Sequence, residues 1–267
     1  MDLHMRLGLL DLQQGEKMSD ARREWKLYKY MVDLPEFGQT SLISALPQDL
    51  FESQINEVFD QRHYKKGRVK KDMVIIDIGG NMGLTALYFK DWAKMIYALE
   101  PSTVHYKTLV KNTEGLKNVK TFNFGISSIG GPDKIFSNDQ GDIPESLFGN
   151  GQLSETQNFQ TLEVFMKEQK IDHVDLLKID AEGAEYFIFP SDGFKNVASK
   201  IDNIIGEAHY FSHCMPEHVI LMLEEAGYKA KILPFPNMWK DITFTEKATR
   251  EQRHYKIELK TMFFASR

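Results

Sequence analysis

The stretch Val74-Ile-Ile-Asp-Ile-Gly-Gly-Asn-Met-Gly83 decides the fold of this chain. Its apolar run, rich in β-branched residues, ends at Asp77 and is followed by a glycine-rich turn. Apolar residues then recur at helical spacing over residues 84–89. A strand, a tight turn and a helix in this order form the first half of a βαβ unit, which binds a nucleotide-like ligand at its turn. The glycines let a ligand approach the backbone closely.

The turn also narrows the class of ligand. A dinucleotide fingerprint of the G-x-G-x-x-G type would place glycine at the positions of Asp77 and Met82. The carboxylate of Asp77 would repel a pyrophosphate, but it suits a ligand that carries an ammonium group and a sulfonium. The turn therefore favours S-adenosylmethionine over NAD and argues against a nicotinamide oxidoreductase.

From Met73 onward, apolar runs of strand length alternate with helical patterns, which is typical of a parallel sheet covered on both faces. We therefore expect an α/β fold. The predicted strands are residues 74–78, 95–99, 119–124, 174–179, 201–206, 229–233 and 257–265, with a short extended piece at 134–136. The predicted helices include residues 104–112, a helix capped by Thr161, and residues 216–226 closed by Gly227.

Residues 1–72 are predicted to form a helical cap or extension, separate from the ligand-binding domain at residues 73–267. Ser19 can cap a helix over Asp20–Val32, and Pro47 suits the first turn of a second helix. These helices are candidates for a dimer arm, a cap over the site or a docking surface. A homo-oligomer formed through them is one expectation.

Ligands of open α/β sheets bind outside the carboxyl ends of the strands. Glu100 ends the second predicted strand about 20 residues after Gly79, where nucleotide-binding folds place an acid that holds the ribose hydroxyls. The polar segments 137–160 and 234–255 leave from the same edge and are long enough to be binding loops. The features that meet at this edge are the turn 79–83, Glu100, and residues 125–127, 180–185 and 207–209.

Four motifs in residues 73–267 carry a family resemblance. They are Asp77-Ile-Gly-Gly-Asn-Met-Gly83, Ala98-Leu-Glu-Pro101, Leu177-Lys-Ile-Asp-Ala-Glu-Gly-Ala-Glu185 and Gly206-Glu-Ala-His209. Together they resemble the FkbM-type family of class I S-adenosylmethionine-dependent methyltransferases. The ordinary class I turn has glycine where Asn81 stands, so this asparagine favours the narrower family. Asparagine can adopt left-handed dihedral angles at modest cost.

The resemblance implies a Rossmann-like fold with a seven-stranded, mostly parallel sheet whose last strand is antiparallel. It implies that Asp77 and Gly79 lie along the methionine end of S-adenosylmethionine, Glu100 on its ribose and Gly125-Ile126 close to its adenine. The residues expected to bind the cofactor are Asp77, Gly79, Gly80, Asn81, Gly83, Glu100, Pro101, Ser102, Gly125, Ile126, Asp180, Ala181 and Glu182. Members of the family mostly methylate hydroxyls of sugars or natural products, and some methylate amide nitrogen.

Methylation of a hydroxyl requires a base, because the hydroxyl must lose its proton. His209 is the leading candidate, since imidazole accepts a proton near neutral pH, and Asp180 is its rival. Glu207 is the third candidate catalytic residue, and a purely structural histidine bonded to Glu207 is the alternative interpretation of His209. We interpret the chain as an O-methyltransferase of sugars or natural products. The alternatives are N-methylation of an amide in a peptide side chain and a non-catalytic, cofactor-binding scaffold.

No metal is expected in the site. Glu207, His209, His213, Cys214 and His218 lie close together in the sequence, but their spacing matches no standard zinc pattern. If a metal binds, the expected form is a hard cation such as Mg²⁺ held by Asp180 and Glu207.

The composition limits the partners and the location of the protein. The formal net charge of -5 and the pI of about 5.9 give no overall attraction to nucleic acid or to anionic membranes. A single cysteine, Cys214, excludes an internal disulfide. No apolar run reaches the roughly 20 residues of a membrane span, and the N-terminus lacks the pattern of a secretory signal. We expect a cytoplasmic protein that acts on a small-molecule or peptide acceptor.

Overall fold

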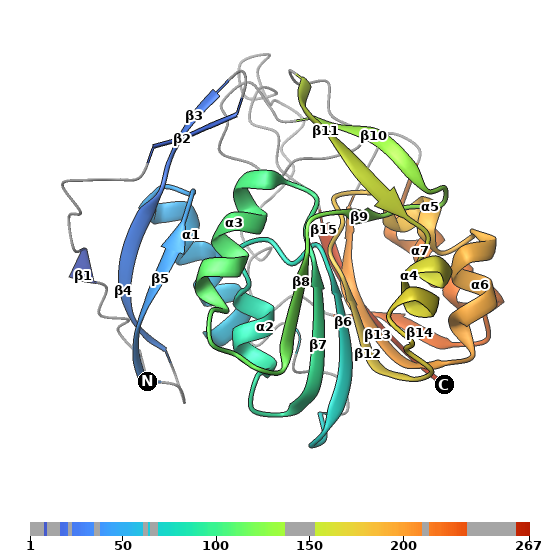
Figure 1. Ribbon diagram of the computed structural model, residues 1–267. Coiled ribbons are helices and arrows are strands. Elements are labelled where there is room, and N and C mark those ends of the chain that lie inside the picture. Colours follow the sequence, from blue (N-terminus) through green and yellow to red (C-terminus); the bar gives the residue numbers. More distant parts are fainter. Residues whose placement is uncertain are drawn as a thin grey trace, which may run out of the picture.

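A seven-stranded sheet forms the centre of the computed structural model (Figure 1), which describes residues 8–9, 17–20, 23–34, 38–60, 64, 69–136, 153–209, 214–233 and 260–267. The strand order is β14-β15-β13-β12-β6-β7-β8. The strands are β6 (Met73–Ile78), β7 (Ala93–Leu99), β8 (Val119–Phe122), β12 (Val174–Ile179), β13 (Ile201–His209), β14 (Lys229–Ile232) and β15 (Lys260–Ser266). β15 is antiparallel to both of its neighbours, and the other pairs of this sheet are parallel. The predicted mostly parallel sheet with an antiparallel last strand is confirmed.

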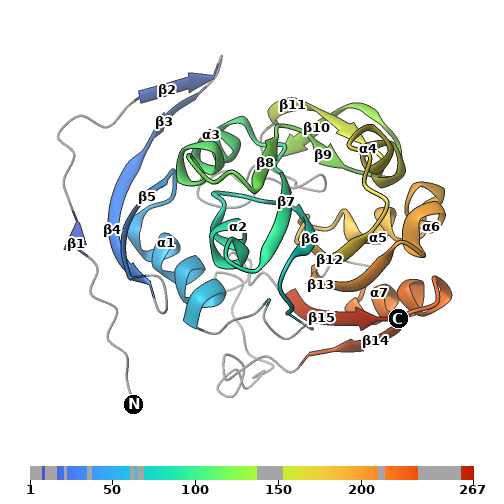
Figure 2. The same cartoon turned by 60° about the horizontal axis from the view of Figure 1, so that its bottom comes forward.

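Both faces of this sheet are covered. Consecutive strand residues point to opposite faces, and Ile75 and Ile76 of β6 are both fully buried. Ile76 belongs to an apolar cluster with residues of α4, α5, α6 and α7, whereas Ile75 belongs to a second cluster with residues of α1 and α2. Figure 2 shows these two groups of helices on opposite sides of the sheet. Strands that are buried on both faces have apolar residues at nearly every position, which explains the continuous apolar runs in the sequences of the central strands.

The helices around the sheet begin and end largely where local signals place them. They are α1 (Gln48–Ile55), the π-helical turn η1 (Asn56–Asp60), α2 (Leu84–Phe89), α3 (Thr103–Asn112), α4 (Leu162–Glu168), α5 (Glu185–Ile188), α6 (Asp192–Ala198) and α7 (Pro216–Glu225). The hydroxyl of Thr161 accepts a hydrogen bond from the backbone N–H of Val164, which confirms the predicted cap of α4. In the part of the chain that the structure describes, no helix has the length and apolar character of a membrane span.

The prediction of a helix over Asp20–Val32 is wrong. This segment contributes to β2 (Lys17–Asp20), β3 (Arg23–Lys26) and β4 (Tyr28–Leu34), and β4 pairs with β1 (Gly8–Leu9) and with β5 (Gly38–Ser44) in antiparallel fashion. The reason lies in β4, where Tyr30, Val32 and Leu34 are buried and alternate with more exposed residues. That period of two belongs to a strand, and the tertiary contact of this face outweighs the helical spacing.

The second N-terminal helix, predicted to begin at Pro47, is confirmed as α1 and η1. The described part of the extension thus holds the antiparallel pairs β2–β3 and β4–β5, with β1 beside β4, followed by α1 and η1. Among the described residues, only one of the two helices predicted as candidates for self-association is present. The boundary at residues 72–73 stays a prediction, although β6 begins at Met73.

The N-terminal part is attached firmly to the sheet. The side chain of Asn112 in α3 accepts a hydrogen bond from the backbone N–H of Ile43 at 2.7 Å and donates to the backbone oxygens of Ile43 and Met82 at 2.8 Å. Buried residues of β4, β5 and α1 share one apolar cluster with β6 and α2. The extension therefore contributes to the core of the protein.

The predicted loop over residues 137–160 is partly a strand. Residues 153–160 form β11 (Leu153–Gln160), which pairs antiparallel with β10 (Gly131–Phe136) and parallel with β9 (Gly125–Ile126). The contact between Phe159 and Gly125 accounts for this difference from the prediction. The buried side chain of Phe159 packs against Gly125 of β9, which favours a strand at this position over a loop. Residues 137–152 and the predicted loop 234–255 lie outside the described residues.

Candidate active site

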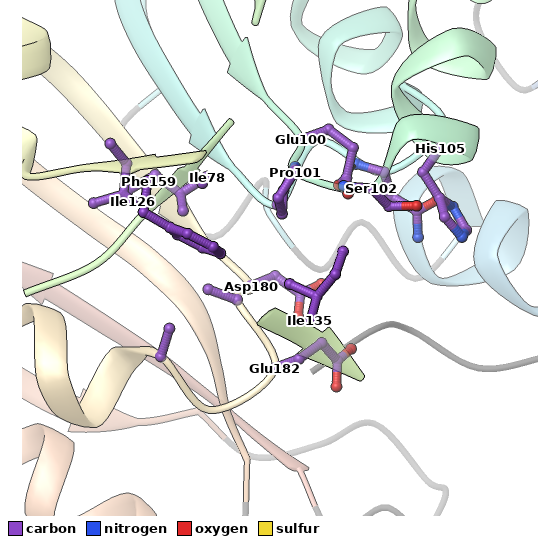
Figure 3. Close-up of a pocket in the computed structure, with 15 residues that line it drawn as sticks. Ile78, Glu100, Pro101, Ser102, His105, Ile126, Ile135, Phe159, Asp180 and Glu182 are labelled. Atoms are coloured by element: carbon purple, nitrogen blue, oxygen red, sulfur yellow. Dashed lines mark hydrogen bonds between the residues drawn. The ribbon is translucent and has the colours of Figure 1, made fainter. Parts of the chain in front are cut away.

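A pocket lies at the carboxyl ends of β6, β7 and β12, at the edge where the sequence places the ligand. It is lined by Ile78, Gly79, Asn81, Glu100, Pro101, Ser102, His105, Gly125, Ile126, Ile135, Phe159, Asp180, Ala181, Glu182 and Ala184. Figure 3 shows Ile126 and Phe159 on one side of this pocket and Glu100 and His105 on the other. The pocket thus has an apolar side and a polar side.

The glycine turn brings two sides of the pocket together. Gly79 has a φ of +77°, and a Cβ added to it would lie 1.8 Å from the backbone oxygen of Asp180. Only glycine allows this approach of the β6 turn to the residue that follows β12. Asn81 adopts a φ of +45°, in agreement with the left-handed tolerance expected of asparagine.

Glu100 is fixed by the backbone on the polar side of the pocket. One carboxylate oxygen accepts a hydrogen bond from the N–H of Asn81 at 2.8 Å, and the other accepts from the N–H of Ser102 at 2.9 Å. The residue is buried, with 7% of its surface exposed. A carboxylate held in this way keeps a fixed direction and retains lone pairs for further donors, such as a pair of hydroxyls.

A cluster of acids surrounds His209 at the ends of β12 and β13. Its Nε2 atom lies 3.6 Å from Oδ1 of Asp180 and 3.4 Å from Oε2 of Glu182, and its Nδ1 atom lies 3.4 Å from Oε1 of Glu185. Because β13 continues beyond the predicted Gly206, both Glu207 and His209 belong to the strand. The structure therefore brings His209 and Asp180 together, as the sequence predicted.

The N-terminal part adds Tyr64 to this cluster. Its hydroxyl lies 3.4 Å from Oδ2 of Asp180 and 3.3 Å from Oε1 of Glu207, and Nζ of Lys178 lies 5.4 Å from the centre of its ring. The Tyr64 hydroxyl thus links Glu207 to Asp180 and to the rest of the cluster. Sequence reasoning missed Tyr64 because it stands as a single aromatic residue within a basic stretch.

The sequence matches the model of the methyltransferase FkbM domain over residues 77–230, which is more than half of the chain. The chain belongs to the FkbM-type methyltransferase family. It is an S-adenosylmethionine-dependent methyltransferase, as the motifs of its strand ends predict.

Relatives of this FkbM-type enzyme are distant. Methyltransferase sdnD of Sordaria araneosa is 27% identical over 241 residues, which cover 74% of this chain and 90% of the relative. A putative methyltransferase of Streptococcus mutans, solved in complex with SAH, has a TM-score of 0.44 and 9% identity and covers 74% of this chain and 90% of its own. A putative methyltransferase in complex with the Haloferax volcanii Trm112 activator has a TM-score of 0.45 and 12% identity, covering 82% and 92% of the two chains. The family assignment accordingly rests on the domain match.

The pocket of the FkbM-type enzyme fits S-adenosylmethionine. Gly79 carries no side chain, and a Cβ there would collide with the backbone oxygen of Asp180, so the turn borders the pocket with backbone alone. The fixed carboxylate of Glu100 can accept hydrogen bonds from hydroxyl groups. All residues predicted to bind the cofactor line the pocket except Asp77, Gly80 and Gly83. Gly83 has a structural task as the N-cap of α2, with a φ of +90°.

Asp77 differs from its predicted place. It is completely buried behind the pocket, where Oδ1 lies 3.1 Å from Nζ of Lys178. Lys178 also donates to the backbone oxygen of Gly79 at 2.7 Å. Burial lowers the pKa of Lys178, but the carboxylates of Asp77 and Asp180 more than offset this and raise the pKa overall. The cation that Asp77 meets in the structure is therefore Lys178, and Asp77 supports the glycine turn from behind.

The surroundings of His209 bear on its predicted role as a base. Burial by itself lowers the pKa of its imidazole, but the carboxylates of Glu182, Glu185 and Asp180 together raise that pKa well above the usual range. His209 is also buried, with 5% of its surface exposed, and it is not among the residues that line the pocket. Asp180, whose side chain lines the pocket and is 23% exposed, is better placed to take a proton.

Sequence reasoning also missed His105. Its Nδ1 atom lies 2.7 Å from Oδ1 of Asn81, so the ring carries its proton on Nδ1. Burial lowers the pKa of His105 to about 4, which keeps the ring neutral at physiological pH. The signal that could have found it is its place in the first turns of α3, the helix that begins directly after Glu100-Pro101-Ser102. Phe159 was missed because it belongs to the segment predicted as a loop, and Ile135 because no role was assigned to the short extended piece at 134–136.

Proposed function

We propose that this methyltransferase methylates a hydroxyl of a sugar or another natural-product small molecule. The observation that carries this proposal is the position of Asp180, whose carboxylate lines the cofactor pocket and also contacts the cluster around His209. A hydroxyl is a weak acid, so its methylation needs a proton acceptor beside the transferred methyl group. Asp180 supplies one at the edge of the pocket.

The cofactor is held by both sides of the pocket in this proposal. Glu100 accepts hydrogen bonds from the ribose hydroxyls, since both of its oxygens are already oriented by backbone N–H groups. Ile126 and Phe159 provide an apolar surface for the adenine, as the family resemblance implies for Ile126. Gly79 and Ala181 would hold the methionine end, on the side of the pocket where Asp180 lies.

Bound S-adenosylmethionine would supply an activated methyl group, because its sulfonium sulfur can leave with the electron pair of the C–S bond. Asp180 takes the hydroxyl proton, so that no charge accumulates on the acceptor oxygen. Asp180 is oriented by His209 at 3.6 Å and by the Tyr64 hydroxyl at 3.4 Å. Correct alignment and the exclusion of water provide much of the acceleration.

Release of S-adenosylhomocysteine from a panel of sugar, polyol, phenol and amide acceptors tests this function. We expect turnover with hydroxyl acceptors and a loss of about 10²–10⁴-fold in kcat for Asp180→Asn. Asp202→Asn is the matched control, because this acid lies at the opposite end of β13 and is 45% exposed. Turnover restricted to amide acceptors, or an Asp180→Asn variant as active as Asp202→Asn, would contradict the proposal.

A further inference from the structure

We propose that Asp180, Glu182 and His209 bind one divalent transition-metal ion beside the cofactor pocket. Each residue offers one ligand atom, and these three atoms lie within 4.8 Å of one another. They come from the end of β13 and from the segment that follows β12, two neighbouring parallel strands. This set differs from the pair Asp180 and Glu207 that the sequence favoured for a metal.

The distances within the set fit ligands around a common ion. Nε2 of His209 lies 3.4 Å from Oε2 of Glu182 and 3.6 Å from Oδ1 of Asp180. Charge-assisted hydrogen bonds between such groups would measure about 2.7–2.9 Å. Ligands at about 2.0–2.2 Å from a tetrahedral metal are separated by roughly 3.3–3.6 Å. The spacing of these atoms therefore leaves a place for an ion between them.

The ring of His209 points to a ligand independently of the acids. Only 5% of this residue is exposed, and neither ring nitrogen makes a hydrogen bond within the described part of the chain. Nδ1 faces Glu185 at 3.4 Å, and the same oxygen of Glu185 accepts a hydrogen bond from the N–H of Ala181 at 2.8 Å. A carboxylate behind the far nitrogen of a histidine is the usual arrangement in metal sites, because it orients the ring and raises its basicity. Nε2 is thus the atom turned toward the ion.

The backbone holds the ligands close to each other. A Cβ at Gly206 would lie 2.1 Å from the backbone oxygen of Ile179, so glycine permits β12 and β13 to approach just before Asp180 and His209. Glu182 has a φ of +49°, an unfavourable conformation for this residue type. Such conformations persist where the surrounding structure enforces them, often at functional sites.

One imidazole and two carboxylates favour Mn²⁺ or Zn²⁺ over Mg²⁺, which prefers oxygen ligands and retains its water. Three protein ligands leave a position open for a further oxygen. Because Asp180 and Glu182 line the pocket, an acceptor oxygen can occupy that position, and this role rests on the proposed hydroxyl methylation. The ion lowers the pKa of the hydroxyl, and the proton passes to Oδ2 of Asp180, the oxygen that is not a ligand in this set.

Titration of the metal-free protein with Mn²⁺, followed by electron paramagnetic resonance, tests the site directly. We expect one bound Mn²⁺ per chain, with nitrogen coupling from an imidazole in the pulsed spectrum. Glu182→Gln should weaken binding by at least about 10-fold, and His209→Gln should remove the nitrogen coupling. A competing titration with Zn²⁺ should displace the Mn²⁺.

The matched control is His173→Gln. His173 lies with Asp175 and Asp202 in the second such group of potential ligands among the described residues, but it is half exposed, and Asp175 is already engaged by Lys70 and by the N–H of Val74. This variant should bind Mn²⁺ like the unchanged protein. Binding lost in His173→Gln, binding unchanged in Glu182→Gln, or no binding at all would overturn the site and leave His209 as a counter-charge to the acids.

Calorimetry with S-adenosylhomocysteine on the same samples separates this inference from the proposed function. It also shows that each variant is folded. If no Mn²⁺ binds while S-adenosylhomocysteine binds and hydroxyl acceptors are methylated, the metal site is refuted and the proposed function stands. If Mn²⁺ binds through His209 but only amide acceptors react, the site stands and the hydroxyl methylation fails.

Discussion

The two sides of the pocket hold their carboxylates in opposite ways. Glu100 is fixed by two backbone N–H groups at 2.8 and 2.9 Å. Asp180 and Glu182 instead face the ring of His209 at 3.4–3.6 Å, beyond the length of a good hydrogen bond. A backbone-fixed acid suits a constant ligand such as the cofactor. Acids that surround a histidine suit a step in which charge or a proton moves.

Replacing Gly79 should break both sides at once, because its turn touches Asp180 directly. In Gly79→Ala the new Cβ would meet the Asp180 oxygen at 1.8 Å, so we expect loss of S-adenosylhomocysteine binding and a large fall in the melting temperature. Gly115→Ala is the control, since Gly115 has a similar φ of +83° but a Cβ added there would meet no described atom within 4 Å. Equal melting temperatures of the two variants would show that strain alone, and not the close approach, matters at Gly79.

Lys178 contacts residues that belong to both sides of the pocket. Its Nζ atom lies near the carboxylates of Asp77 and Asp180 and donates a hydrogen bond to the backbone oxygen of Gly79. Lys178→Met leaves a buried carboxylate without its cation, and we expect a loss of about 3–5 kcal/mol in the free energy of unfolding. The double variant Asp77→Asn with Lys178→Met should recover part of this loss, measured by urea unfolding. A double variant that is less stable than Lys178→Met alone would refute the pairing.

His105 makes the cofactor side sensitive to acid. Its pKa is about 6.5 in the unfolded chain and about 4 in the fold. Between these values the unfolded state binds a proton that the native state does not, so stability falls as the pH falls from 6.5 to 4. The contribution reaches about 3 kcal/mol at most. Urea unfolding across this range should give a flatter pH profile for His105→Gln, and parallel profiles would contradict the assignment.

Tyr64 should have the smallest effect, because it only orients acids on the acceptor side. For Tyr64→Phe we expect a fall of several-fold in kcat and an unchanged affinity for S-adenosylhomocysteine, since the ring over Lys178 is kept and one hydrogen bond is worth about 1 kcal/mol. Affinity that falls as strongly as kcat would place Tyr64 on the cofactor side.

The features that could be predicted from the sequence depend on local patterns, whereas most of those that were missed depend on contacts between residues far apart in the chain. The strand β12 matches its predicted bounds, because a strand buried on both faces reads as one apolar run. Glu100 was singled out because it ends a predicted strand about 20 residues after Gly79, where nucleotide-binding folds place an acid. The neighbour of Asp77 was not predictable from its turn, because Lys178 comes from another strand about 100 residues later. The position of Tyr64 depends on packing between distant segments, which local patterns do not contain. The strand β4 was missed although its period of two is local, because helical spacing was preferred there.

The most direct test of the division into a cofactor side and an acceptor side is calorimetry. S-adenosylhomocysteine is titrated in parallel into the unchanged enzyme, Glu100→Gln and Asp180→Asn. Loss of the fixed charge should weaken binding by about 10–100-fold in Glu100→Gln, as expected for hydrogen bonds to a charged group, whereas Asp180→Asn should stay within a few-fold of the unchanged enzyme. An Asp180→Asn variant that loses as much affinity as Glu100→Gln, or a Glu100→Gln variant that loses none, would contradict the account.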